Sequence, residues 1–197
     1  MSPDNLQLLR CAMGQYAELS DSTWSRLGEC CRERKIGKNE YLTTIGSPCY
    51  HFYFVCQGLI RSFTVSIDGR EYNKRFFPEH TFPGSIRALL KGEPSDFALQ
   101  ALEPSTLIEI DHLEYRRILE SAEDLKWYHI MYLEKNWVLD KEPIEVGLAL
   151  SDSKERYLTF LERYSDTSER IPLHHIASAI GVTPTQLSRI RRSIISK

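Results

Sequence analysis

Residues 173–192, near the C-terminus, carry a pattern that few chain conformations can satisfy. Two short helices that cross steeply need a small residue at their contact and a residue that tolerates left-handed backbone in the turn. Ala177 supplies the first and Gly181 the second, four residues later. Thr183 is placed to cap the next helix, and Gln186 completes a capping box. The pattern predicts a helix-turn-helix.

The second helix of this motif has two distinct sides. At about 100° per residue, Leu187, Ile190 and Ile194 form its buried side. The opposite side carries short polar groups and arginines, which can pair bidentately with guanine or reach phosphates and base edges in the major groove. Arg191 lies nearer the buried side and is expected to reach a phosphate. The side chains predicted to contact DNA are Thr183, Pro184, Thr185, Gln186, Ser188, Arg189, Arg191 and Arg192.

Charge is unevenly distributed along the chain, although the net charge of the whole is −2. From Lys154 onward, Lys and Arg outnumber Asp and Glu by eight to four, and no acidic residue follows Glu169. A basic end on an acidic body is expected when one segment approaches phosphates. A two-helix scaffold without a ligand is the alternative, but it would less often combine the alanine, the glycine, the cap and the absence of acids.

The residues before this motif predict a β-rich body between helices. Apolar spacing indicates helices over the first 31 residues, and the chemistry changes to strands from about residue 33 to 111. Aromatic and β-branched residues dominate 51–55 and 59–65, which is typical of strands. Asp68-Gly69 predicts a hairpin with a type I′ turn. Recurrent glycines favour a small antiparallel barrel or roll.

From His112 the chain is predicted to be helical again. Leu125, Tyr128, Tyr132, Leu139 and Val146 approximate an a/d pattern, which fits equally a dimer seam or a helix packed on its own barrel. Pro143 should kink or break the helix. A hinge and cap at residues 151–153 divide the chain into two predicted domains, 1–150 and 151–197.

The sequence resembles the Crp–Fnr family of bacterial transcription regulators over nearly its whole length. The stretches 54–61, 68–69 and 176–191 carry the resemblance, the last most specifically. It implies an α+β fold: an N-terminal β-roll like a cyclic nucleotide-binding domain, a long dimerisation helix and a C-terminal all-α helix-turn-helix. It implies a sequence-specific regulator that acts as a homodimer, with Pro184, Thr185 and Arg189 at the base-contact positions. Implied partners are double-stranded DNA, a second copy of the chain, RNA polymerase and a small effector.

The effector pocket departs from the family pattern. Cyclic-nucleotide binders have a Gly-Glu pair for the ribose and an Arg-Ser pair for the phosphate, but Ser85 replaces the glutamate and Ser95-Asp96 replaces the later pair. Without that arginine a buried phosphate loses its charge-assisted partner, so we expect an effector other than cyclic AMP, or none. The printed sequence stops at Lys197, so the family's β-hairpin wing is expected to be nearly absent. The residues predicted for the pocket are Gly84, Ser85, Ile86, Arg87, Ser95 and Asp96.

Catalytic and metal-binding motifs are not found in the sequence. The six histidines have no HxH or HExxH spacing, and there is no GxSxG, P-loop or GxGxxG. We therefore expect no enzyme, no cofactor and no metal site. Two alternatives stay open, a cupin-like metalloenzyme and a β-barrel interaction module, each with a helical tail that does not bind DNA.

The cysteines and the N-terminus bear on the compartment. Five cysteines without a CxxC spacing predict reduced, mostly buried thiols, with a redox or iron–sulfur sensor as the alternative. The first residues lack the layout of a signal peptide, and no apolar run reaches the length of a membrane helix. We therefore expect a cytoplasmic protein with no membrane partner.

Overall fold

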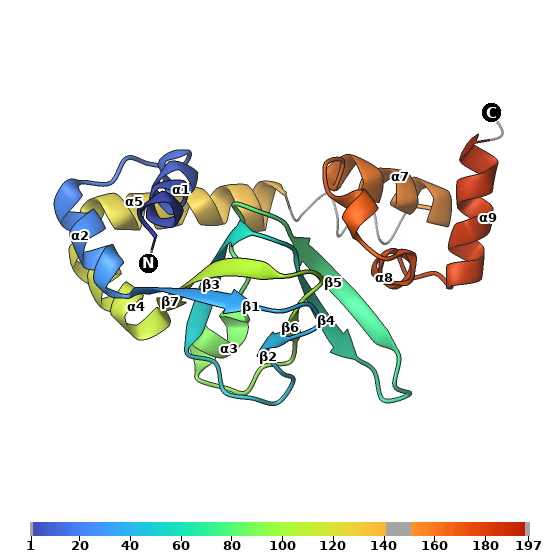
Figure 1. Cartoon of the computed structure of the whole chain (residues 1–197), viewed down its shortest axis with the longest axis horizontal. Coiled ribbons are helices and arrows are strands. Elements are labelled where there is room, and N and C mark those ends of the chain that lie inside the picture. The colour runs from blue at the N-terminus through green and yellow to red at the C-terminus, as the bar shows by residue number, and fades with distance from the viewer. Residues whose placement is uncertain (1, 141–150, 196–197) are drawn as a thin grey trace.

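A computed structural model describes residues 2–140 and 151–195 and has an α+β architecture (Figure 1). Two short helices and a β-roll form the N-terminal part, and a long helix runs along one side of the roll. The C-terminal helices lie at the opposite end of the molecule from the N-terminus.

The N-terminal helices are α1 (Pro3–Gly14) and α2 (Asp21–Glu29). Ser20 caps α2, because its hydroxyl accepts a 3.3 Å hydrogen bond from the Thr23 amide. Leu9 and Met13 of α1 are buried against the roll. Helix α2 ends at Glu29, and the first strand begins at Cys31.

The roll consists of two antiparallel sheets that enclose an aromatic and aliphatic core. Val55, Ile60 and Leu107 are completely buried between them, whereas Phe54 is completely buried against the helices. Tyr72 lies outside this core, because it is 41% exposed. The three-stranded sheet has the order β1 (Cys31–Ile36), β7 (Ser105–Asp111), β3 (His51–Gln57), and the four-stranded sheet has the order β2 (Tyr41–Thr43), β6 (Ala98–Ala101), β4 (Ile60–Val65), β5 (Glu71–Phe77).

The β4–β5 hairpin is confirmed, but its predicted turn type is wrong. Only Gly69 has a positive φ, of 79°, whereas a type I′ turn needs two such residues. The Gly69 amide donates to the Ser66 carbonyl, and the Ser66 amide donates to Arg70 across the loop, each at 2.9 Å. This is the pattern of a three-residue loop that ends in a left-handed glycine. A short helix that the sequence did not predict, α3 (Ile86–Lys91), interrupts the strand region.

After the roll come α4 (His112–Ser121), α5 (Glu123–Leu133) and the wider helical turns η1 (Glu134–Leu139). Leu125 and Tyr128 of α5 are buried, and the Tyr16 ring meets Tyr128 and Tyr132 edge-on. Leu125, Tyr128 and Tyr132 belong to the predicted a/d pattern, and all three pack within one chain. This is what we expect of a helix that packs on its own chain rather than on a partner. Leu139 is 68% exposed, and Pro143 and Val146 lie outside the described residues.

The C-terminal part consists of α7 (Ser153–Arg163), η2 (Ser168–Arg170), α8 (Leu173–Ala179) and α9 (Pro184–Ile195). The predicted cap of α7 is a full capping box between Asp152 and Glu155. Phe76 of β5 packs edge-on against Phe160 and Tyr164, so these helices share a core with the roll. No described helix is both long and apolar enough to cross a membrane.

Candidate nucleic-acid interface and ligand cavity

The turn between α8 and α9 has the geometry that the sequence predicts. Ala177 is completely buried at the contact of the two helices. Gly181 has a φ of 71°, and the following amide, of Val182, returns to the Ala177 carbonyl at 3.0 Å. This left-handed residue ends α8 and lets α9 start in a new direction.

The N-terminus of α9 is closed by the predicted capping box. The Thr183 amide donates to the Gln186 side-chain oxygen at 2.9 Å, and the Gln186 amide donates to the Thr183 hydroxyl at 3.2 Å. The Thr183 hydroxyl and the Gln186 side-chain oxygen are both engaged in the cap, so these two side chains fix the start of α9 and the direction of its axis.

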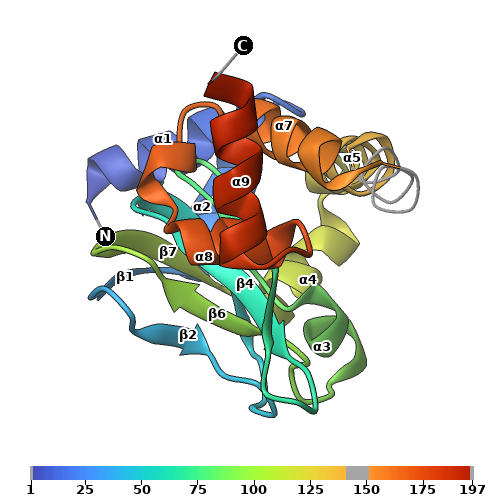
Figure 2. The same ribbon diagram turned by 90° about the vertical axis from the view of Figure 1, so that its right-hand side faces the viewer.

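The outer face of α9 is exposed, and α9 is the outermost element at the C-terminal end of the molecule (Figures 1 and 2). Leu187 is 1% exposed and anchors the inner face. Arg191 is half-buried, nearer that inner face, as predicted. Within the described residues no carboxylate forms an ion pair with Arg189 or Arg191. The exposed residues among those predicted to contact DNA are Thr183, Pro184, Thr185, Gln186, Ser188, Arg189 and Arg192.

Helix α8 is bound to the edge strand β5, which the sequence did not predict. The Ser178 hydroxyl donates to the Glu71 carbonyl at 2.7 Å and accepts from the Asn73 amide at 3.0 Å. His175 is 8% exposed, and its Nδ1 lies 3.0 Å from Nη1 of the buried Arg61. Burial and the Arg61 charge lower the pKa of His175 to about 4. The available signal was Arg61 itself, a charge within a strand of apolar residues.

The two stretches predicted for the effector pocket contact each other, but most of their side chains do not line a cavity. Ser85 and Ser95 are buried and hydrogen-bonded to each other at 2.8 Å. Arg87 points to the surface, where it pairs with Asp96 at 2.5 Å and with Glu93 at 3.0 Å. Where a cyclic phosphate would need an arginine, the two serines thus satisfy one another.

A cavity of about 330 Å³ lies beside the Ser85–Ser95 pair, and Gly84 and Ile86 are part of its wall. Of the predicted pocket residues, only Gly84 and Ile86 line it. The rest of its wall comes from β3, β4, β5, α3, α4, α5, η1, α7 and Phe82, and it includes cations that the sequence analysis did not assign to a site. The residues that line the cavity are far apart in the sequence, so no local motif could have predicted it.

A metal site and a cysteine-based sensor were the other kinds of site considered from the sequence. No three His, Cys, Asp or Glu side chains there are grouped so as to hold a metal ion. All five cysteines are free, and Cys30, Cys31 and Cys56 are buried.

Comparisons with known proteins agree with this geometry. Residues 33–122 match the family described as cyclic nucleotide-binding domain. A potassium channel of Arabidopsis thaliana, GORK, is 30% identical over 81 residues, which is 41% of this chain and only 10% of the channel.

The similar solved structures cover far more of the chain. The c-di-GMP responsive global regulator CLP of Xanthomonas campestris has a TM-score of 0.70 at 17% identity, over 90% of this chain and 92% of that one. FixK2 of Bradyrhizobium japonicum has a TM-score of 0.71 at 17% identity, over 84% and 85%. DNR of Pseudomonas aeruginosa has a TM-score of 0.61 at 18% identity, over 98% and 88%. Residues 33–122 therefore resemble a cyclic nucleotide-binding domain, and the chain shares the fold of these solved regulators over most of its length.

Proposed function

We propose that this protein is a sequence-specific DNA-binding transcription regulator that acts as a homodimer in the cytoplasm. One observation carries the proposal: α9 presents an exposed face with Thr185, Ser188, Arg189 and Arg192, at the end of a segment without acidic residues. Such a face can enter the major groove and pair arginine with guanine. Residues 151–197 are proposed as the DNA-binding domain or reading head, and residues 1–150 as the sensor domain with the dimerisation helix.

An exposed apolar strip on the long helix supports the homodimer. Trp127 and Ile130 of α5 are 56% and 44% exposed, and Val138 of η1 is 52% exposed. Large apolar side chains that gather on one element mark an interaction site. A second copy is the proposed occupant, because a two-fold dimer places two reading heads on half-sites about one helical turn apart.

The test is selection of binding sites from random duplex DNA by the full-length protein, repeated at two salt concentrations. We expect a two-fold symmetric motif, with affinity that falls steeply with salt because several Lys and Arg contact phosphates. An Arg117→Ala variant is the matched control, because Arg117 is an exposed cation of α4 far from α9 in sequence. Absence of DNA binding at every salt concentration would instead favour the interaction module.

A further inference from the structure

The 330 Å³ cavity is walled by three parts of the chain that a single ligand would touch together. The sheet contributes Ser62 and Phe77, the long helix contributes Tyr132, and α7 contributes Arg163. Small-molecule sites in proteins begin at about this volume and favour the junctions between structural units.

The chemistry of the cavity differs from that of a cyclic-nucleotide cradle. The corner that would hold the phosphate is closed by the Ser85–Ser95 hydrogen bond, and neither serine lines the cavity. Arg87 is held outside by Glu93 and Asp96. A ligand of this cavity must therefore take its polar partners from other elements.

The charges that face the cavity have one sign. Its described lining includes Lys74, Arg75, Arg116 and Arg163 and contains no Asp or Glu. Arg75 and Arg116 are half-buried, and no ion pair joins either of them to a described carboxylate. A low-dielectric cavity with uncompensated positive charge attracts an anion more strongly than an exposed patch does.

Two histidines on the α4–α5 side of the cavity lie near Arg116, and their pKa values respond to its charge. Burial and then the Arg116 charge lower the pKa of His112 and of His129. Both rings are therefore neutral near pH 7 and can serve as hydrogen-bond partners beside the permanent charge of Arg116. Nδ1 of His129 already lies 3.1 Å from the Tyr115 hydroxyl.

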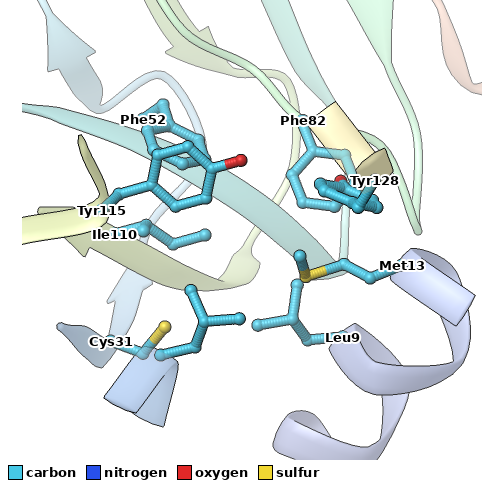
Figure 3. Close-up of a pocket in the computed structure, with 9 residues that line it drawn as sticks. Leu9, Met13, Cys31, Phe52, Phe82, Ile110, Tyr115 and Tyr128 are labelled. Carbon is cyan, nitrogen blue, oxygen red and sulfur yellow. The ribbon is translucent and has the colours of Figure 1, made fainter. Parts of the chain in front are cut away.

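The body of the cavity is aromatic. Phe52, Phe82, Tyr115 and Tyr128 line both this cavity and a small apolar pocket of about 20 Å³ behind it. Figure 3 shows these four rings as a layer over Leu9, Met13, Cys31 and Ile110. A ring layer backed by carbon accepts a flat apolar body and offers a ribose few hydrogen bonds.

We propose that the cavity binds a small organic anion with a flat hydrocarbon body, whose charge is balanced by Arg75 and Arg116 and whose body packs on the aromatic layer. This proposal rests on the proposed function only in that such a ligand would be the effector. Because Arg163 belongs to α7, occupancy of the cavity would also bear on the position of the helix-turn-helix.

The test uses two fluorescent probes of nearly equal body and different charge. The full-length protein is titrated with the anion 8-anilinonaphthalene-1-sulfonate and with neutral N-phenyl-1-naphthylamine. We expect the anion to bind at least about tenfold more tightly, since a charge-assisted pair is worth a factor of that order. Arg75→Gln combined with Arg116→Gln should remove that preference and leave the neutral probe unchanged. Arg117→Gln, on the exposed face of α4, should behave as the wild type.

Measurements on the wild-type protein alone can also overturn the proposal. Equal affinity of the wild type for the two probes would show that the arginines do not select an anion. Displacement of the anionic probe by cyclic AMP at similar affinity would return the site to a nucleotide. DNA-site selection without any probe is a separate measurement, so an intact DNA motif with no anion preference defeats the cavity proposal alone. Anion selection without DNA binding defeats the proposed function alone.

Discussion

Arg61 of the β-roll and His175 of the helix-turn-helix are hydrogen-bonded through Nη1 and Nδ1 at 3.0 Å, both inside the protein. A guanidinium can only donate, so Nδ1 of His175 accepts and the ring is neutral. Glu71 balances the arginine at 2.5 Å, and Gln100 accepts from its Nε at 2.8 Å. The contact ties the proposed reading head to the sensor through a group that can gain a proton.

Acid should weaken this contact and lower the stability of the fold. The pKa of His175 is about 4 in the folded protein against about 6.5 in the unfolded chain, because burial and Arg61 disfavour the charged ring. The unfolded chain thus binds the proton more readily, so stability is full above about pH 6.5 and falls as the pH drops towards 4. The loss is at most about 3 kcal/mol. Urea unfolding at about pH 7.5 and about pH 5 measures it.

The comparison of two glutamine variants isolates His175 from other groups. His112 and His129 also have lowered pKa values and contribute in the same direction. His175→Gln should flatten the pH dependence, whereas His174→Gln, at the exposed neighbouring position, should change it much less, because burial and Arg61 lower the His175 pKa more than His174 does. An unchanged slope in His175→Gln would mean that the ring does not titrate in this contact.

Arg170 should stabilise the same junction through two carboxylates. It donates to both oxygens of Glu79, at 3.0 and 2.8 Å, and also pairs with Glu103. Burial alone would raise the pKa of Glu79, but the Arg170 bonds lower it to about 2. A double-mutant cycle of Arg170→Gln and Glu79→Gln should give a coupling of about 1–3 kcal/mol by urea unfolding. The same cycle on the exposed Arg87–Asp96 pair should give less than about 1 kcal/mol, and equal couplings would contradict the assignment.

Gly58 should not tolerate a side chain. An added Cβ would lie 2.2 Å from the Ser105 hydroxyl and 2.8 Å from the Ser105 Cα, at a φ of 107°. Gly58→Ala should therefore cost more than about 2 kcal/mol of stability, measured by thermal or urea unfolding. Gly69→Ala is the matched control, since it shares a positive φ but has open space around it, and should cost about 1 kcal/mol. Equal losses would attribute the whole effect to backbone strain.

Local signals made the helix-turn-helix predictable. Ala177, Gly181 and the Thr183–Gln186 cap each act within a few residues, so spacing alone specifies the geometry found. The hairpin was predictable for the same reason. Its turn type was not, because Asp68 keeps an ordinary negative φ and only Gly69 takes the left-handed one.

The long helix and the cavity show where sequence reasoning stops. Helix α5 is apolar on more than one side, and periodicity cannot say which side packs within the chain. Leu125 and Tyr128 turned out to face inward, while Trp127 and Ile130 face outward. The cavity is lined by eight helices and strands, so its arginines become neighbours of one site only when the chain is folded.

Arg189 and Arg192 should affect DNA binding in different ways. Arg189→Ala should cost about 1–3 kcal/mol at one base position and relax specificity there, because the guanidinium is proposed to read a base edge. Arg192→Ala should weaken all sequences nearly uniformly and reduce the salt slope by about one, because a phosphate contact is proposed. Competition binding with single-base variants of the selected site measures both. Uniform losses in Arg189→Ala would assign it to the phosphate backbone instead.

The outward side of α5, rather than the inward side that carries Leu125 and Tyr128, should hold the dimer together. Ile130→Glu places a charge on a side chain that is 44% exposed in the single chain, so the monomer should fold while the dimer dissociates. Leu125→Ala instead removes a completely buried side chain and should cost about 2–5 kcal/mol of stability without a specific effect on association. Sedimentation equilibrium and urea unfolding of both variants separate the two effects. A dimer that survives Ile130→Glu would have to be joined elsewhere, and the exposed strip on α5 would then need another partner.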